Sequence, residues 1–398
     1  MNRPAEFAQS GIAVIPKGWK LVSLKEIAEL KNGERPLMDN MGSIPIYGAN
    51  GIMGQSYDSL VNKDYTIIIG RIGASGEIYL AKGKIWVSDN AIYTNDYRKK
   101  DIFLPFLYFL LLFRDLGQYS TKTTHPIITQ NFLKNFRIIL PPYPEQKKIA
   151  EVLSTVDQAI EKVGEAIEKT QRLKKGLMQE LLTKGIGHKE FKDTEIRMIP
   201  KNWGVRKIEE ISLDFVSGGT PSTPNKKYWN GDIPWMTSAF ITEREIRAGQ
   251  RYITKEGLKN SATNIVPKDN LVVATRVGIG KAAINRIDLA ISQDLTGVII
   301  DKKQGYPEFL YWALTNSETK LKSLAQGSTI KRILREGLGK IKLPLPPLPE
   351  QQKIAEILAS VDKRLELLRE KKERLQRTKK GLMNDLLTGK RRVRLDSV

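Results

Sequence analysis

Few side chains in this sequence could carry out catalysis. The 398 residues include no cysteine, so thiol nucleophiles, disulfides and cysteine-ligated metal sites are excluded. His125 and His188 are the only two histidines, which leaves almost no material for a Ser-His-Asp array or a histidine-based metal site. A chain without cysteine also fits a reducing compartment, and we expect it to be cytoplasmic.

Two short motifs imitate catalytic ones but lack a residue that the chemistry requires. Residues 140–143 (LPPY) resemble the Asn-Pro-Pro-Tyr box of amino-methyltransferases, yet Leu140 offers no polar acceptor for an exocyclic amine. Residues 278–281 (GIGK) resemble a phosphate loop, but Thr275 stands where the first glycine belongs and Ala282 replaces the hydroxyl that binds magnesium. A helix-entry turn and an ordinary glycine loop explain the two motifs better.

A third arrangement, Asp301 with Glu318 and Lys320, loosely imitates a nuclease triad. Such spacings arise by chance in a lysine-rich chain, and Glu318 and Lys320 are better explained as helix surface. We therefore predict a non-catalytic protein with no metal site and no cofactor of its own. An autonomous nuclease or methyltransferase stays open as an alternative, which activity of the purified chain alone would reveal.

The charge points to a polyanionic partner. Lysine and arginine number 65 against 44 acidic residues, which gives a net charge of +21. Regions 1–140 and 185–345 carry +5 and +9 of this excess, so it is more than the solvated face of a helix. Nucleic acid is the leading inference, and an acidic protein partner is the alternative.

Polar loop residues are the candidates for contacting DNA, because Arg and Lys bond guanine edges or phosphates and Asn bonds adenine. They are Tyr47, Asn50, Arg71, Lys122, Thr123 and His125 in the first half, and Lys226, Lys227, Tyr228, Arg276, Lys281, Lys331 and Arg332 in the second. Trp19, Trp203 and Trp235 are expected in the core. The basic stretch 390–394 is expected to be either a phosphate-contacting arm or disordered.

A duplicated segment must position these loops. Residues 141–157 (PPYPEQKKIAEVLSTVD) recur at 346–362 as PPLPEQQKIAEILASVD, and the match continues to 183 and 388 at a constant offset of 205 positions. Each copy reads as a helix of about 40 residues, roughly 60 Å long, that starts at a Pro-Glu pair suited to a helix N-terminus.

Apolar residues follow a heptad seam in both copies, which predicts that the two helices pair with each other. Two independent amphipathic helices, each packed on its own domain, are the alternative. The seam consists of Ile149, Leu153, Val156, Ile160, Val163 and Ile167 in the first helix, and Ile354, Leu358, Val361, Leu365, Leu368 and Leu375 in the second. Val152, Ile357 and Leu367 flank it and are candidate contacts for a partner protein or for the domains.

The repeat is larger than the helix. Residues 15–19 (IPKGW) and 199–203 (IPKNW) open two globular regions. Strand patterns at 66–76 and 84–94 and a helix at 102–113 are echoed at 271–281, 289–300 and 307–316, whereas the polar loops differ. We therefore predict two similar mixed α/β domains joined by two antiparallel helices with pseudo-two-fold symmetry. The expected boundaries are domain 1–143, helix 144–186, domain 187–348, helix 349–390 and basic tail 391–398.

This order of domains, with the duplicated PPxPEQxxIA helix and the stretch GGTPSTPNKKYWNGDIPWMTS at 218–238, resembles the specificity subunit of type I restriction-modification enzymes over essentially the whole chain. The resemblance implies two target recognition domains, each reading one half of a bipartite double-stranded DNA sequence. It also implies that the helices set the spacing and dock two methyltransferase subunits.

In the family, the subunit directs N6-adenine methylation, and with two motor-nuclease subunits added it directs ATP-dependent translocation and cleavage. S-adenosylmethionine, ATP and magnesium would then belong to partner subunits. A coiled-coil scaffold that binds only proteins is the alternative function. We expect no membrane association, since no segment reaches 18 consecutive apolar residues.

Overall fold

The computed structural model describes residues 15–36, 42–97, 101–121, 124, 126–323, 325 and 332–395. The chain forms two compact units, one made of Met1–Glu165 with Arg369–Val398 and the other of Ala166–Leu368. Each unit therefore combines a globular domain, the beginning of the long helix that follows it, and the end of the other long helix.

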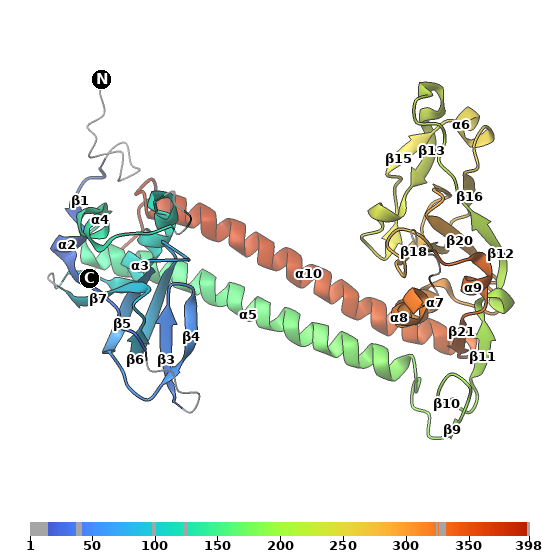
Figure 1. Cartoon of the computed structure of the whole chain (residues 1–398), viewed down its shortest axis with the longest axis horizontal. Coiled ribbons are helices and arrows are strands. Elements are labelled where there is room, and N and C mark those ends of the chain that lie inside the picture. Colours follow the sequence, from blue (N-terminus) through green and yellow to red (C-terminus); the bar gives the residue numbers. More distant parts are fainter. Residues whose placement is uncertain are drawn as a thin grey trace. The chain divides into compact units, whose positions relative to one another are not determined.

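The two repeated segments form the long helices α5 (Tyr143–Leu181) and α10 (Leu348–Leu386), each of 39 residues (Figure 1). A proline and a glutamate occupy the first turn of both, where a missing N–H costs nothing and a carboxylate meets the positive end of the helix dipole. Both helices end before the predicted residues 186 and 390, because Gly185 and Gly389 adopt φ values of +69° and +70°.

The domain of the first unit is a six-stranded sheet with helix α3 (Leu104–Phe113) packed on it (Figure 1). In sheet order the strands are β2 (Ala28–Asn32), β7 (Ala91–Tyr97), β5 (Val61–Gly70), β6 (Ile78–Val87), β3 (Ile44–Gly48) and β4 (Gly51–Ser56). A separate pair, β1 (Lys20–Ser23) with β8 (Arg137–Leu140), is joined to the short helices α2 (Leu24–Ile27), η1 (Leu116–Tyr119) and α4 (Gln130–Asn135).

The domain of the second unit carries two sheets. The five-stranded sheet has the order β12 (Ser212–Ser217), β20 (Leu295–Ile300), β17 (Asn270–Ala274), β18 (Ala282–Asn285) and β14 (Glu245–Ile246). The four-stranded sheet has the order β15 (Arg251–Ile253), β13 (Trp229–Met236), β19 (Leu289–Ile291) and β16 (Asn264–Val266). Two strand pairs complete it, β11 (Gly204–Lys207) with β21 (Lys342–Leu345) and β9 (Phe191–Lys192) with β10 (Ile199–Pro200).

Short helices connect the strands of the second domain. They are η2 (Ile208–Ile211), η3 (Lys226–Tyr228), η4 (Ser238–Phe240), α6 (Lys255–Lys259), α7 (Pro307–Thr315), α8 (Glu318–Ser323) and α9 (Arg335–Gly339). Helix α7 packs on β18 and β17 as α3 packs on β6 and β5 in the first domain. The prediction of two similar mixed α/β domains is thus confirmed.

Two predicted strands are shorter than expected. Those predicted at 66–76 and 271–281 end at Gly70 and Ala274, and each is followed by a loop. Gly73 and Gly278 turn these loops with φ values of +87° and +70°, a conformation that L residues rarely adopt. The repeated Arg-x-Gly pattern therefore marks an exposed loop and not the end of a strand.

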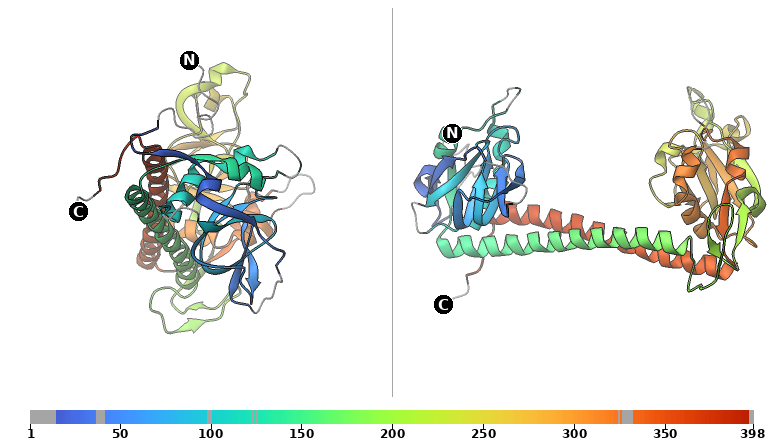
Figure 2. Two further views of the ribbon diagram at one scale, coloured as in Figure 1. Left: turned by 90° about the vertical axis from the view of Figure 1, so that its left-hand side faces the viewer. Right: turned by 60° about the horizontal axis from the view of Figure 1, so that its bottom comes forward.

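Within each unit the helix segments run antiparallel (Figure 2). In the first unit, Asp157 near the start of α5 pairs with Lys379 near the end of α10 at 2.6 Å. In the second, Lys174 near the end of α5 pairs with Asp362 near the start of α10 at 2.5 Å. The two aspartates, and likewise the two lysines, lie 205 positions apart in the sequence, so the same contact is made twice.

The predicted seam residues differ in how deeply they are buried. Seven are buried: Ile149, Leu153, Val163, Ile354, Leu358, Val361 and Leu365. Val156, Ile160, Ile167, Leu368 and Leu375 are half-buried. Ile149 and Leu153 share the first domain's core with Leu386 and Leu387 of the other helix end, so domain and seam form one apolar cluster there.

Candidate functional site

A tryptophan and a glutamate join each domain to its long helix. Trp19 Nε1 donates a hydrogen bond of 3.1 Å to Glu145 Oε2, and Trp203 Nε1 donates one of 3.0 Å to Glu350 Oε2. These four residues belong to the Ile-Pro-Lys-x-Trp and Pro-Glu-Gln motifs. The motifs, far apart in sequence, are therefore the two sides of one contact, which sets how each domain sits on its helix.

The glutamine after each glutamate also joins the domain to its long helix. Gln146 accepts from Phe103 N at 2.9 Å and donates to Asp101 O and Pro141 O at 3.0 and 2.9 Å. Gln351 makes the same three bonds in the second unit, with Tyr306 N, Gln304 O and Pro346 O as partners. Both glutamines are at most 1% exposed, so each amide holds the segment before α3 or α7 against the start of its long helix.

Replacing Gln351 by alanine tests this role. The change leaves the buried carbonyl of Pro346 and the partly buried Tyr306 N–H and Gln304 carbonyl without their partner, which is expected to cost about 1–3 kcal/mol of stability. Differential scanning calorimetry should show a lower transition temperature for Gln351→Ala than for Gln352→Ala, the exposed neighbour on the same helix. Equal transition temperatures for the two variants would contradict the assigned role.

Glu145 and Glu350, besides their tryptophans, are also bonded by residues that follow the end of the other long helix. In the first unit, the Arg392 guanidinium bonds Glu145 through Nε and a terminal nitrogen at 2.5 and 2.7 Å. In the second, His188 Nε2 and Ile186 N lie 2.7 and 3.0 Å from Glu350 Oε1. For Arg392, the prediction of a free or phosphate-binding basic tail is wrong, because a buried carboxylate with 3% exposure holds it.

The two ion pairs between the helices also contact the domains. Lys379 Nζ lies 5.5 Å from the centre of the Phe109 ring, and Lys174 Nζ lies 4.9 Å from that of Trp312. Phe109 and Trp312 occupy corresponding places on α3 and α7. Burial, with the Asp362 carboxylate, raises the pKa of the adjacent Tyr311 to about 12, so this tyrosine stays neutral. Each domain thus rests on both helices.

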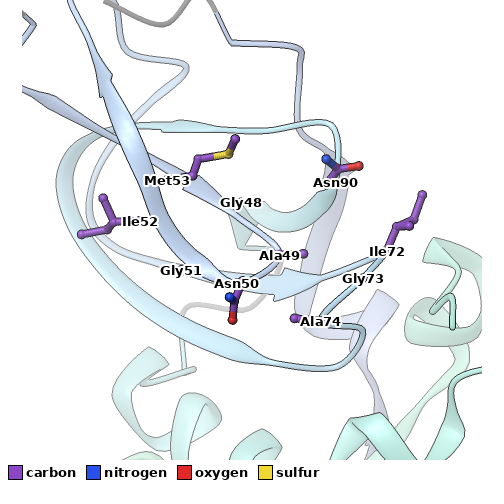
Figure 3. A pocket seen from close by; sticks show the side chains of 10 residues that line it. All are labelled: Gly48, Ala49, Asn50, Gly51, Ile52, Met53, Ile72, Gly73, Ala74 and Asn90. Carbon is purple, nitrogen blue, oxygen red and sulfur yellow. The ribbon is translucent and has the colours of Figure 1, made fainter. Parts of the chain in front are cut away.

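The strand-connecting loops of the first domain surround an open groove of about 680 Å³ (Figure 3). Its walls come from the β3–β4 hairpin, the loop after β5 and the turn between β6 and β7. They are formed by Gly48, Ala49, Asn50, Gly51, Ile52, Met53, Ile72, Gly73, Ala74 and Asn90. The groove combines exposed carboxamides with apolar side chains, a combination suited to base edges.

Only part of the predicted DNA-contacting set in the first domain gathers at this groove. Asn50 lines it, and Arg71 directly precedes the lining residue Ile72. Tyr47 is half-buried at the end of β3, where burial raises its pKa, and its ring lies 6.3 Å from that of Tyr79. Lys122, Thr123 and His125 lie outside the described residues.

In the second domain the predicted residues form two groups. Arg276 and Lys281 are exposed on the loop between β17 and β18, and exposed Arg332 precedes Ile333, whose N donates to Thr275 O of that loop at 2.8 Å. The residues of η3, Lys226, Lys227 and Tyr228, instead lie beside the four-stranded sheet, where Lys227 O and Tyr228 O accept hydrogen bonds from Thr254 Oγ1 and Thr254 N. Lys331 lies outside the described residues.

The sequence alone did not single out Asn90, Gln293 and Asp294, which occupy the turns between the sheet strands next to these loops. Val152 and Ile357 were expected to contact either a partner protein or the domains, and they take the second role: Val152 packs on the first core and Ile357 on the second. Leu367 is 53% exposed and keeps its candidate role. Trp19, Trp203 and Trp235 are buried, as predicted.

Membrane spans and metal clusters are both absent from the described part of the chain. No helix there is both long and apolar enough to cross a bilayer. No group of three or more His, Cys, Asp or Glu side chains there could hold a metal ion.

The comparisons with known proteins all indicate the same family. The model of the type I restriction modification DNA specificity domain matches residues 16–169 and 200–377. A Methanocaldococcus jannaschii sequence provisionally named the type I restriction enzyme MjaX specificity subunit is 30% identical over 98% of this chain and 97% of its own length. The MjaVIII specificity subunit of the same organism is 29% identical over 96% and 94% of the two chains.

The fold agrees as well. The crystal structure of the type I restriction-modification S subunit from M. genitalium matches with a TM-score of 0.65 at 18% identity, covering 94% of this chain and 96% of that one. The two matched regions of the family model begin beside Trp19 and Trp203 and extend into α5 and α10. The chain belongs to the family of type I restriction-modification DNA specificity subunits.

Proposed function

We propose that each domain reads one half of a bipartite double-stranded DNA target, and that the chain itself is non-catalytic. One observation carries the proposal. The two domains are fixed to the helices by the same contacts, through Glu145 and Gln146 in one unit and Glu350 and Gln351 in the other, while their exposed loops differ. A repeated scaffold with divergent loops is what reading two different half-sites requires.

The long helices are proposed to set the spacing between the half-sites. Each has 39 residues, about 60 Å at 1.5 Å per residue. This length exceeds one helical repeat of DNA, roughly 34–36 Å, the centre-to-centre distance that a protein with two DNA-reading elements commonly spans. Inserting or deleting helix residues in register would then lengthen or shorten the spacer of the target and leave both half-sites unchanged.

The exposed helix faces are proposed to dock two methyltransferase subunits. Gly176 and Gly381 stand inside the helices, and nothing lies within 4 Å of a Cβ added to either. A helix-interior glycine costs about 1 kcal/mol relative to alanine, so its presence in both copies is unexplained by the subunit alone. Close approach of a partner backbone explains it, and Leu173 and Leu367, 52% and 53% exposed, provide apolar contacts.

Alanine at both glycines should separate stability from docking. We expect Gly176→Ala with Gly381→Ala to stabilise the free subunit by about 1 kcal/mol per site, since the helices are continuous and the space is open. The same variant should bind the methyltransferase more weakly in co-purification, whereas alanine at Gly337, a glycine of the short helix α9 where an added Cβ meets Ile333 at an ordinary 3.7 Å, should not. Unchanged methyltransferase binding would contradict docking at the glycines.

Partners supply the chemistry in this proposal. S-adenosylmethionine is assigned to the methyltransferase subunits, and ATP with magnesium to two motor-nuclease subunits where these join. Host DNA is the substrate, which places the assembly in the cytoplasm. The net charge of +21 supports the DNA-binding role, because cationic surfaces gain affinity by releasing counterions from the phosphates.

Salt dependence tests DNA binding most simply. The complex of this chain with its methyltransferase should bind duplex DNA. The logarithm of its association constant should fall linearly with the logarithm of the salt concentration. The methyltransferase alone should bind more weakly and without preference for one sequence. Equal DNA binding by the methyltransferase with and without this chain would favour a coiled-coil scaffold that contacts only proteins.

A further inference from the structure

The turn that follows β6 in the first domain and β19 in the second is the same structure in both. Ala91 N donates to Ser88 O at 2.9 Å, and Leu295 N donates to Ser292 O at 3.1 Å. The serine hydroxyl accepts from the backbone N two residues on, at 3.4 Å in the first domain and 3.3 Å in the second. Residues 88–90 (SDN) and 292–294 (SQD) are therefore equivalent.

The turn is tied to the neighbouring loops by matching bonds. The carbonyl of the third residue accepts a hydrogen bond from the loop that follows β5 or β17. Asn90 O accepts from Arg71 N at 2.8 Å, and Asp294 O accepts from Thr275 N at 2.9 Å. The serine N donates to the end of the parallel strand, Tyr47 O in one domain and Met236 O in the other. Both serines are at most 1% exposed, so the third residue is presented from a fixed backbone.

The side chain at this third position is available to a ligand. Asn90 is exposed and Asp294 half-buried, and neither side chain makes a hydrogen bond or ion pair to another residue in the described part of the chain. Asn90 also lines the groove of the first domain (Figure 3). The side chain of the preceding residue is instead hydrogen-bonded within the domain in both turns. Asp89 Oδ1 accepts from Ser88 Oγ at 3.0 Å, and Gln293 Oε1 accepts from Thr220 Oγ1 at 2.6 Å.

The surroundings of the two positions differ in chemistry. Figure 3 shows a second carboxamide, Asn50, and the apolar side chains of Ile52, Met53 and Ile72 around the groove that Asn90 lines. Near Asp294 the corresponding loop carries Arg276, the counterpart of Arg71 in the repeated Arg-x-Gly pattern, together with the exposed Lys281. The first site thus offers two amides and apolar groups beside an arginine, and the second offers a carboxylate beside an arginine and a lysine.

We propose that Asn90 and Asp294 are equivalent base-reading positions, which rests on the proposed function of the two domains. Asparagine bonds adenine at N6 and N7 while an apolar side chain meets the thymine methyl group, so the first half-site has an A·T pair at this step. Aspartate accepts from cytosine N4, so the second half-site has a G·C pair at the corresponding step.

Reciprocal variants test the proposal in the complete methyltransferase complex. Asn90→Asp should change one base pair of the first half-site, and Asp294→Asn should change one base pair of the second, with the other half unchanged as an internal control. Methylation of the original sequence should fall by about 5- to 150-fold, the discrimination of one good base contact. The readout is long-read sequencing of N6-methyladenine in a host without adenine methylation of its own.

Three controls keep the result decisive. Asn62→Asp and Asp232→Asn make the same charge changes at exposed strand residues outside the groove and turns, and should leave the recognised sequence intact. Asn90→Ala and Asp294→Ala should relax the same base pair instead of changing it. Co-purification with the methyltransferase shows that each variant folds.

The outcomes separate the inference from the function on which it rests. If the wild-type chain directs methylation to a split sequence and the Asp, Asn and Ala variants all give that same sequence with equal efficiency, the base-reading inference is overturned and the proposed function stands. If the wild-type complex methylates no defined sequence, the proposed function fails, and the inference with it.

Discussion

Glu145→Ala is expected to destabilise the first unit strongly, because the change breaks the contact between its domain and both long helices. The substitution removes the acceptor of the buried Trp19 indole N–H and both bonds to Arg392. Leaving a buried donor and a paired charge without their partner is expected to cost roughly 2–4 kcal/mol. This figure is lower than for a fully buried ion pair, because the Arg392 side chain is 44% exposed and solvent screens its charge. The unfolding temperature of the first unit should fall by roughly 5–15 °C.

Calorimetry of three variants would check this expectation. Glu145→Gln keeps an acceptor for Trp19 but loses the charge that holds Arg392, so its transition should lie between those of the wild type and Glu145→Ala. Glu161→Ala, an exposed residue of the same helix, should be neutral. If Glu145→Ala and Glu161→Ala unfolded at the same temperature, the anchor between domain and helix would carry no stability.

Removing four cations from the proposed DNA-contacting surface of the second domain, which comprises η3 and the loop between β17 and β18, is expected to have the largest effect on DNA binding. Lys226, Lys227, Arg276 and Lys281 are exposed, and none forms an ion pair with another described residue. If each contacts a phosphate, counterion release predicts about a fivefold loss of affinity per cation near 0.15 M salt, hence roughly 100- to 1,000-fold for the quadruple alanine variant. The slope of log affinity against log salt should decrease by about 3–4.

A matched variant controls for net charge. Alanine at Lys189, Lys192, Lys302 and Lys303 removes the same charge from exposed positions in the second unit that lie off the proposed surface. Fluorescence anisotropy of the methyltransferase complex on a labelled duplex should show a much smaller loss for this control. Similar losses for the two quadruple variants would mean that overall charge, and not this surface, governs binding.

The long helices and the paired domains could be predicted from the sequence because both signals are periodic or repeated. The heptad pattern and the Pro-Glu start located α5 and α10 to within a few residues. The duplicated Ile-Pro-Lys-x-Trp and Pro-Glu-Gln motifs were also visible. That Trp19 bonds Glu145, 126 positions away, was not, since nothing local in the sequence encodes which distant groups a fold brings together.

The recognition loops were harder to predict. The repeat has an offset of 205 positions in the helices but 204 at the turns, where Ser88 corresponds to Ser292, so alignment at one offset hides the equivalence of Asn90 and Asp294. Arg392 was expected to lie in a phosphate-contacting arm or a disordered tail, because charge alone does not reveal a buried carboxylate partner. The place of Asn50 on an exposed loop could be predicted, because a polar residue between two strands is a sufficient signal for that.

The most direct test of the central claim is to map N6-methyladenine in a host without adenine methylation of its own, expressing the methyltransferase subunit with and without this chain. We expect methylation of one split sequence, two defined halves separated by a spacer of fixed length, only when this chain is present. Identical methylation in both cells, or methylation at a single uninterrupted sequence, would contradict the reading of one half-site by each domain.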